Sequence, residues 1–207
     1  QHYGPLPAVA RPVSQPAPEA GQTARRDHEM KLPIAAEKAK IAWRTVPADH
    51  ADTYALDVAN EVLFTNESSR VYRTLVEDLE LASEVDGASE PLALDGLFVV
   101  DLVLNEGKAA APAVARVFEA LERLAAEGPS EVELSRAKNH LEASFLRSLA
   151  TVGSRATQIG ASELVAGSFR KVFQFVDGIR GVGAGDVKRV VGRYLEERRA
   201  TVVFGRP

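Results

Sequence analysis

The sequence predicts an α+β fold in which a sheet is layered against long helices. Residues 38–45 alternate apolar and polar side chains, as strands buried on one face do. Longer segments in the second half of the chain repeat apolar residues every three or four positions, which is the period of a helix buried on one side. Strands and helices follow one another in mixed order, so we expect their apolar faces to be buried against each other.

Composition and charge exclude several classes of protein. Of the 207 residues, 45% are apolar and 26% are charged, close to the averages of globular domains. The formal net charge is −4 and no basic run is present, so we expect no nucleic acid as a partner. No apolar stretch approaches the ~18 residues that would span a bilayer, so we expect no membrane insertion. Without cysteine, the chain can have no disulfide, thiolate zinc ligand or cysteine nucleophile.

The beginning of the chain differs from the rest. Five of the eleven prolines lie within the first 26 residues, and proline removes a backbone donor and fixes φ. We therefore predict a Pro-rich linker over residues 1–26 and a single α/β domain over residues 27–207. The chain begins with Gln1 rather than methionine, so we expect it to be a piece of a longer protein.

Apolar spacing predicts the elements of the first half of the domain. Ala39, Ile41 and Trp43 share one side of the first strand, whereas Leu56 and Leu63 belong to a helical stripe. Strands are predicted at 38–45, 81–85 and 97–104, and helices at 52–64 and from Ser68 to Leu79.

The second half is predicted to be mostly helical. A helix with Pro112 in its first turn ends at Gly128, and Ser130 with Glu133 forms a capping box for the next. The apolar face of this second helix comprises Leu134, Ala137, Leu141, Phe145 and Leu149. Shorter helices are predicted at 154–166 and 169–180, then one capped by Gly183 and Asp186, and finally a strand at 199–204.

A search for catalytic motifs finds none. The four histidines have no second histidine at ligand spacing, and no Gly-x-Ser-x-Gly nucleophile elbow is present. His140 lies in the middle of a predicted helix, and we expect it to have a structural role at or near the surface. We therefore predict neither catalytic nor metal-binding residues in this chain.

The order of several short motifs resembles the pitrilysin/insulinase-type zinc metallopeptidases. In that family Ser-Ser-Arg-Leu-Tyr begins a helix and Gly-Leu-Ala-Tyr-Ser leads into a strand. Residues 68–72 (Ser-Ser-Arg-Val-Tyr) and Leu81-Ala82 match these motifs, although the preceding turn at 65–67 lacks the family's glycines. Further stretches resemble the family at residues 3–7, 128–139, 154–163, 186–195 and 201–204.

This resemblance implies the C-terminal, non-catalytic half of such an enzyme. The family's fold is a two-layer α/β sandwich, with a mostly antiparallel sheet packed on long helices, as in the mitochondrial processing peptidase. Two such halves enclose a chamber for unfolded peptides, and the zinc-bearing half contains His-x-x-Glu-His. In an overlay of the first helix, Asp57, Asn60 and Glu61 stand where His, Glu and His would be. The chain alone is thus predicted to be inactive and to hold no cofactor, with zinc expected in the partner half.

The family pattern also yields candidates for contact with substrate. Active members place an arginine and a tyrosine, seven residues apart, in the non-zinc half. The matching positions here are Val76 and Ser83, which cannot act as that pair does. Arg70 and Tyr72 complete the set of substrate-contact candidates, although the family pattern suggests that they position the helix.

Three functions compete, and the missing histidine motifs disfavour the third, a hydrolase that uses an unrecognised site of its own. In the first, the chain is the companion half of a working peptidase, forming chamber wall and peptide-binding surface for a zinc-bearing homologous half in the same gene or on a separate subunit. In the second, it is a catalytically dead scaffold or a peptide-binding interaction subunit. An uncovered face could also make isolated chains form a homodimer. Bacterial relatives are often exported, so the periplasm or cell envelope of a bacterium is favoured over the cytoplasm.

Overall fold

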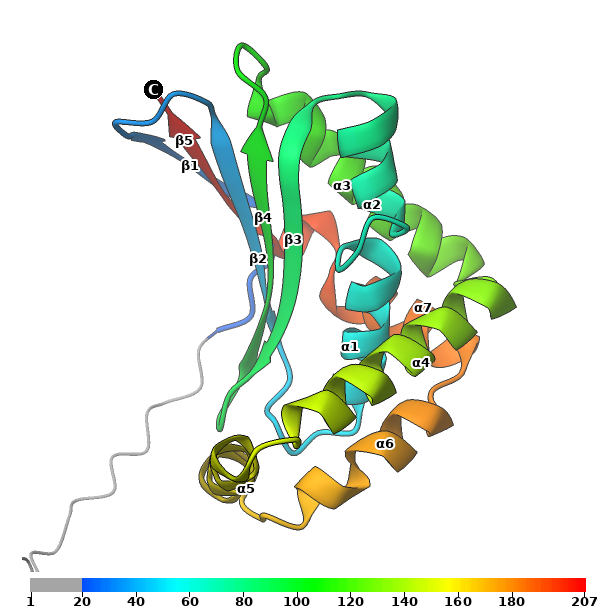
Figure 1. Ribbon diagram of the computed structural model, residues 1–207. Helices are drawn as coiled ribbons and strands as arrows, with labels where there is room; N and C mark the ends of the chain where they lie inside the picture. Colours follow the sequence, from blue (N-terminus) through cyan, green and yellow to red (C-terminus); the bar gives the residue numbers. More distant parts are fainter. Residues whose placement is uncertain (1–19) are drawn as a thin grey trace, which may run out of the picture.

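A computed structural model describes residues 20–207, which form a sheet with helices on one face (Figure 1). The strands are β1 (Arg26–Lys31), β2 (Lys38–Thr45), β3 (Ala82–Pro91), β4 (Gly96–Leu104) and β5 (Thr201–Arg206). The helices are α1 (Asp52–Leu63), α2 (Arg70–Tyr72), the π-helix η1 (Arg73–Asp78), α3 (Ala110–Glu127), α4 (Glu131–Ser148), α5 (Val152–Ala166), α6 (Lys171–Gly181), α7 (Ala184–Tyr194) and the short 3₁₀-helix η2 (Glu197–Arg199). Most of the predicted linker lies outside the described residues.

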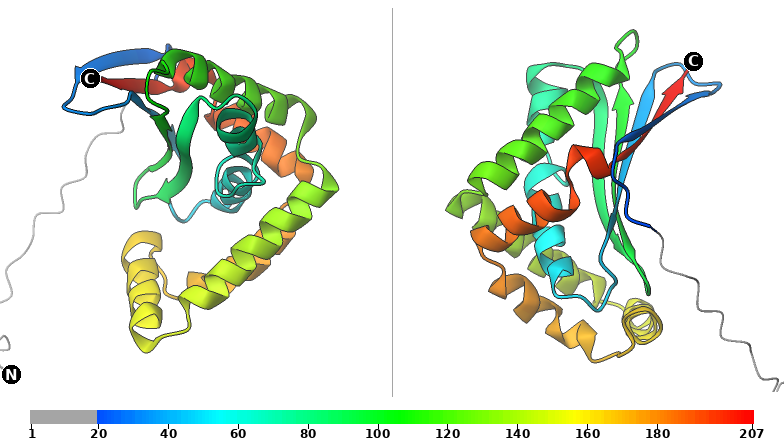
Figure 2. Two further views of the ribbon diagram at one scale, coloured as in Figure 1. Left: turned by 45° about the horizontal axis from the view of Figure 1, so that its top comes forward. Right: turned by 180° about the vertical axis from the view of Figure 1, so that it is seen from behind.

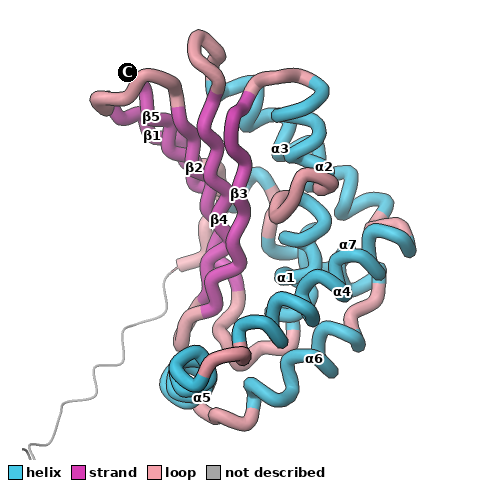
Figure 3. Tube along the Cα trace, viewed as in Figure 1, coloured by secondary structure: helices cyan, strands magenta, loops and turns pink. Residues whose placement is uncertain are grey.

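The five strands form one sheet in the order β1-β5-β2-β4-β3 (Figure 3). The pairs β2–β4, β2–β5 and β3–β4 are antiparallel, and only β1–β5 is parallel. This confirms the predicted two-layer architecture with a mostly antiparallel sheet. Strand β3 is one edge of the sheet, and its irregular pairing between Ala82 and Glu84 is a bulge.

The core lies between the sheet and helices α1, α3 and α7. On β2, Ala39, Ile41 and Trp43 are buried as their alternation predicted. The Trp43 ring meets Phe98 of β4 and Phe118 of α3 edge-on, with ring centroids 6.1 and 6.0 Å apart. The aromatic contacts therefore join both layers. None of the helices within residues 20–207 is long and apolar enough to cross a membrane.

The second predicted helix differs from expectation. A single turn of α-helix is followed by the π-helix η1, in which the Leu79 amide donates to the Thr74 carbonyl oxygen at 3.1 Å. A π-helix has more residues per turn than an α-helix, so side chains beyond it are rotated off the expected face. Leu79, with which the predicted helix ends, is 40% exposed.

The sequence did not predict strand β1. All six of its residues are exposed, so it has no alternation of apolar and polar side chains to reveal it. The strand forms through backbone pairing with β5, and Arg206 of β5 donates to Glu29 at 2.6 Å. Charged side chains of this kind are common on edge strands, where they discourage pairing with other chains.

Helices α4, α5 and α6 lie at the margin of the molecule (Figure 2). Of the predicted apolar face of α4, only Ala137 is buried, whereas Leu134 and Leu141 pack partly against the core. No residue of α5 is buried. The arrangement leaves much of the apolar surface of α4 to α6 without cover from the described part of this chain.

Candidate functional site

The three residues of the zinc-motif overlay lie on α1 and hold neighbouring elements in place. Asn60 donates its side-chain amide to the Gly87 carbonyl oxygen of β3 at 2.8 Å and to the Thr65 hydroxyl oxygen at 3.1 Å. The Asp57 carboxyl lies close to Ser89 of the same strand. These contacts tie α1 to the edge of the sheet.

Glu61, the third of these residues, pairs with His140 of α4. The Glu61 Oε2 and His140 Nδ1 atoms are 2.8 Å apart. The Glu61 side chain is only 6% exposed, whereas His140 is 42% exposed. Burial raises the pKa of the Glu61 carboxyl, and His140 opposes that rise by favouring the charged form. The charged form of the buried Glu61 carboxyl is therefore stabilised by His140, which solvent can reach.

Burial also shifts the titration of Asp57. It raises the pKa of this carboxyl to about 7, and the nearby charge of Glu61 adds to the effect, while the neighbouring Ser89 side chain opposes it. The two carboxyl groups stand one helical turn apart, so they disfavour each other's ionisation. Asp57 thus gains a proton close to neutral pH.

The residues on α1 do not fit a zinc ion. The inverted zinc motif needs two imidazoles one turn apart and a glutamate base between them. This chain has Asp57 and Glu61 at the ligand positions and an amide, Asn60, at the base position. All three side chains are engaged with β3, Thr65 or His140. Over residues 20–207, no group of three or more His, Cys, Asp or Glu side chains is arranged to hold a metal ion.

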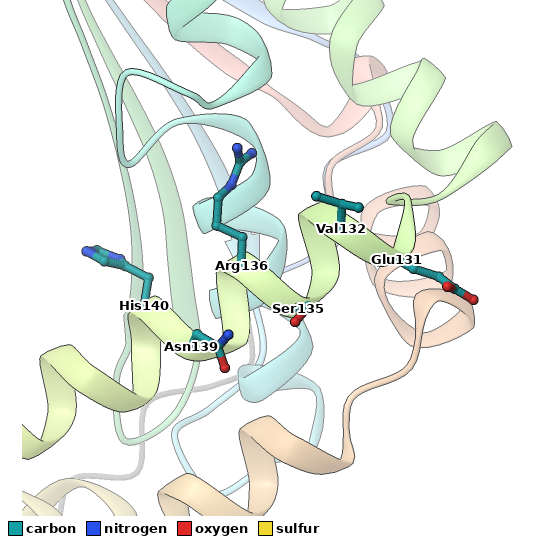
Figure 4. Close-up of a pocket in the computed structure, with 6 residues that line it drawn as sticks. All are labelled: Glu131, Val132, Ser135, Arg136, Asn139 and His140. Atoms are coloured by element: carbon teal, nitrogen blue, oxygen red, sulfur yellow. The ribbon is translucent and has the colours of Figure 1, made fainter.

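Polar contacts join one side of α4 to α1, to α2 and to the loop before α2. Glu133, Arg136 and His140 are spaced so that all three lie on this side of the helix. Arg136 donates to the Ser68 carbonyl oxygen at 3.1 Å, and His140 pairs with Glu61 as described. Figure 4 shows Arg136 and His140 leaving α4 on the same side, whereas Ser135 and Asn139 point elsewhere.

Glu133 and Arg70 form a bidentate ion pair. Arg70 donates to both carboxylate oxygens of Glu133 at 2.7 and 2.8 Å, and to the Gly128 carbonyl oxygen at 3.1 Å. Glu133 also accepts from the Ser130 amide at 2.8 Å, which completes the predicted capping box. The Arg70 guanidinium lowers the pKa of Glu133 to about 2. Arg70 therefore joins α2 to the start of α4.

The other three substrate-contact candidates lie around α2, η1 and β3. Tyr72 and Val76 are half-buried and pack against the core. Ser83 is exposed at the β3 bulge, where its hydroxyl donates to the Val103 carbonyl oxygen at 3.3 Å. The π-helix contacts β3, so Val76 and Ser83 belong to adjoining elements. A contact of these residues with substrate stays a prediction.

Sequence reasoning missed two features of this region. The pairing of Glu61 with His140 joins residues 79 positions apart, and no local pattern links them. A signal existed in α1, because Glu61 interrupts an apolar stripe and a buried glutamate requires a partner. The π-helix had no signal in the spacing, which fits an ordinary helix.

Comparison with known proteins agrees with this geometry. A family model described as the peptidase M16 inactive domain matches residues 1–141. An uncharacterized zinc protease from Mycobacterium tuberculosis is 29% identical over 212 residues, which cover 99% of this chain and 47% of that protein. The chain thus spans about half the length of the curated relatives it matches.

Solved structures share the fold. A protease from Helicobacter pylori superposes with a TM-score of 0.90 and 22% identity, over all of this chain and 50% of that one. A peptidase M16 inactive domain from Pseudomonas fluorescens gives a TM-score of 0.81 at 21% identity, over 98% of this chain and 47% of that one. With the family model covering more than half of its length, the chain belongs to the peptidase M16 inactive-domain family.

Proposed function

We propose that this chain is the companion half of a zinc protease and works only together with a zinc-bearing half. It supplies part of a chamber wall and a strand edge along which an extended peptide can lie. The zinc and the water-activating residues belong to the partner half. An envelope or periplasmic location is part of the same proposal.

The main support comes from the side chains of α1 at the positions of the zinc motif. Its three overlay positions have side chains that cannot form the zinc motif and that hold β3 and α4 instead. These three side chains of α1 therefore stabilise the domain, and we expect the residues that carry out hydrolysis to lie in the partner half. The mycobacterial relative is about twice as long as the segment it shares with this chain, which leaves room in that protein for a second half.

Strand β3 supports the peptide-binding part of the proposal. It is an edge of the sheet and runs for ten residues from Ala82 to Pro91. An edge strand leaves backbone donors and acceptors along one side, and an extended peptide can satisfy them without a fixed side-chain sequence. This mode of binding suits unfolded substrates of varied sequence.

A second candidate function, that of a scaffold without proteolysis, is favoured by two residues. Val76 and Ser83 occupy the positions where the resemblance to active members implies arginine and tyrosine. Neither side chain can supply a cation or a phenolic donor to a peptide carbonyl. A scaffold of this kind would bind peptide or protein but hydrolyse neither.

A peptidase assay with an unfolded fluorogenic peptide separates the two functions. The chain, the zinc-bearing half and the two together are assayed with and without a zinc chelator. The companion-half proposal expects cleavage by the mixture, loss of that cleavage on chelation, and no cleavage by this chain alone. No cleavage by the mixture, with peptide binding retained, would establish the scaffold instead.

Amide hydrogen exchange tests the role of β3 in the same mixture. Peptide is added after zinc has been removed, so that it binds without being cut. Residues 82–91 should then exchange more slowly, while strand β1 at the opposite edge of the sheet serves as the control. Equal exchange at both edges with and without peptide would remove β3 from the proposal.

A further inference from the structure

Exposed apolar side chains are concentrated at one end of the molecule. Thirteen large apolar side chains are exposed among the described residues, and ten of them belong to two segments, 92–97 and 146–173. Those ten, called the apolar end below, are Leu92, Leu94, Leu97, Leu146, Val152, Ile159, Leu164, Val165, Phe169 and Phe173. Both views in Figure 2 agree with Figure 1 in placing α5 beside the turn that joins β3 to β4.

Helix α5 is the centre of the apolar end. It carries too many apolar side chains for a helix that is surrounded by solvent. Leu164 is 83% exposed and Val152 is 76% exposed, yet no residue of the helix is buried. At 3.6 residues per turn these two side chains lie about 120° apart around the axis. A helix with apolar residues on several sides is normally enclosed by protein.

We infer that the apolar end is the surface that docks onto the zinc-bearing half of the same protein. This inference rests on the proposed function, because it requires that such a half exists. It goes further in naming α5 and the adjoining turn as the place of contact.

Charge favours that partner over a second copy of this chain. Residues 146–173 contain four basic side chains and a single acidic one, although the whole chain has a net charge of −4. The acidic one, Glu163, already accepts from the Phe169 amide at 2.8 Å. A symmetric dimer through this end would bring like charges together, whereas a different domain can present an acidic rim.

The distribution of side chains also favours a protein over an anionic membrane. A helix that lies in a membrane surface needs one continuous apolar face opposite a polar one. Val152, Leu164 and Val165 of α5, all exposed, instead point to three different sides of the helix axis. A partner domain can contact the helix on more than one side, which a flat bilayer cannot.

A matched pair of valines tests the inference. Val152 is 76% exposed in the first turn of α5, and Val132 is 74% exposed in the first turn of α4, outside the apolar end. Aspartate is favourable in a first helical turn, so Val152→Asp and Val132→Asp should both fold. Both are made in the protein that contains the two halves, with a protease site placed in the linker.

After the linker is cut, co-elution of the halves in size-exclusion chromatography is measured. We expect wild type and Val132→Asp to stay associated, and Val152→Asp to bind at least ten-fold more weakly with unchanged thermal stability of this half. Equal association of both variants would overturn the inference, while chelator-sensitive cleavage by wild type would leave the companion-half function intact. Wild-type halves that separate on cutting, without peptidase activity, would contradict both.

Two further outcomes would also overturn the choice of partner. One is self-association of the isolated chain that Val152→Asp abolishes and Val132→Asp does not. The other is the same pattern for binding to vesicles that contain anionic lipid. Each would assign the apolar end to a different occupant.

Discussion

The buried Asp57 on α1 makes the stability of the fold depend on pH. Its carboxyl lies beside Glu61 and under β3, and burial raises its pKa to about 7. An unfolded aspartate has a pKa of about 3.9, so the folded chain binds this proton more tightly than the unfolded chain does. The contribution of Asp57 to stability is therefore full below pH 4 and is lost as the pH rises towards 7.

Asp57→Asn should remove the loss of stability that occurs as the pH rises towards 7. Asparagine is neutral and similar in size, so it can occupy the same position beside Ser89. The free energy of unfolding of the variant, relative to wild type, should be about 1–3 kcal/mol higher at pH 8 than at pH 5. Urea denaturation at the two pH values measures this difference. Asp49→Asn, at an exposed position, is the control, and an equal pH response of the two variants would contradict the prediction.

Glu80 is a second residue with a measurable conformational cost. Within the described chain it is the only residue other than glycine with a positive φ, at 47°. Its carbonyl oxygen accepts from the Asn105 side chain at 2.9 Å, which helps to hold it in place. The family motif has glycine at this position, directly before the leucine and alanine that match Leu81 and Ala82.

Glu80→Gly should stabilise the fold by about 1 kcal/mol, because glycine adopts a left-handed conformation without steric cost. The melting temperature and urea midpoint should both rise. Glu84→Gly, in strand β3, is the control and should instead lower them, since glycine weakens a strand. A fall in stability for Glu80→Gly would show that the side chain makes a contact worth more than the strain.

The candidate site was predictable where its chemistry is local. Ser130 with Glu133 and Gly183 with Asp186 were predicted as caps, and both capping contacts are present. The partnership of Glu61 with His140 was not predictable, because it depends on how α4 crosses α1. Sequence alone gives the residues that can pair, and the packing of elements decides which of them do.

At the scale of elements, close packing of helices α1 and α6 depends on a glycine. A Cβ at Gly178 would lie 2.6 Å from the Tyr54 ring of α1, which itself packs edge-on against Phe175 of α6. Gly181 is in the same helix but has open space around it. The two glycines therefore separate helix propensity from packing.

Gly178→Ala should destabilise the chain by about 1–2 kcal/mol, because the steric clash exceeds the gain in helix propensity. Gly181→Ala should leave stability unchanged or raise it by up to about 1 kcal/mol. Chemical denaturation of both variants gives the comparison. Equal effects would mean that Tyr54 moves aside freely and that α6 is not held by this contact.

Elements were predictable when their own side chains face the core. Strands β2 and β4 and helix α7 have buried stripes that the sequence displays, and the structure has them close to the predicted positions. Strand β1 was missed because backbone pairing alone creates it. The π-helix was missed because apolar residues in this part of the sequence are spaced as in an ordinary α-helix.

At the scale of the whole molecule, stability is distributed unevenly between the sheet and the apolar end. Strands β2, β4 and β5 have fully buried residues such as Ile41, Phe98 and Val202. Helix α5 has none, and it is attached to the rest mainly through α6. Segments with few buried apolar contacts open by local fluctuation, without unfolding of the core.

Native-state hydrogen exchange of this chain should therefore show two classes of amide. Those of α5 should exchange roughly 100-fold faster than those of β2, and only the β2 amides should depend strongly on added denaturant. In the protein that contains both halves, docking of the apolar end should slow exchange in α5 and leave β2 unchanged. Protection of α5 equal to that of β2 in the isolated chain would contradict this, because it would mean that α5 needs no partner to be held in place.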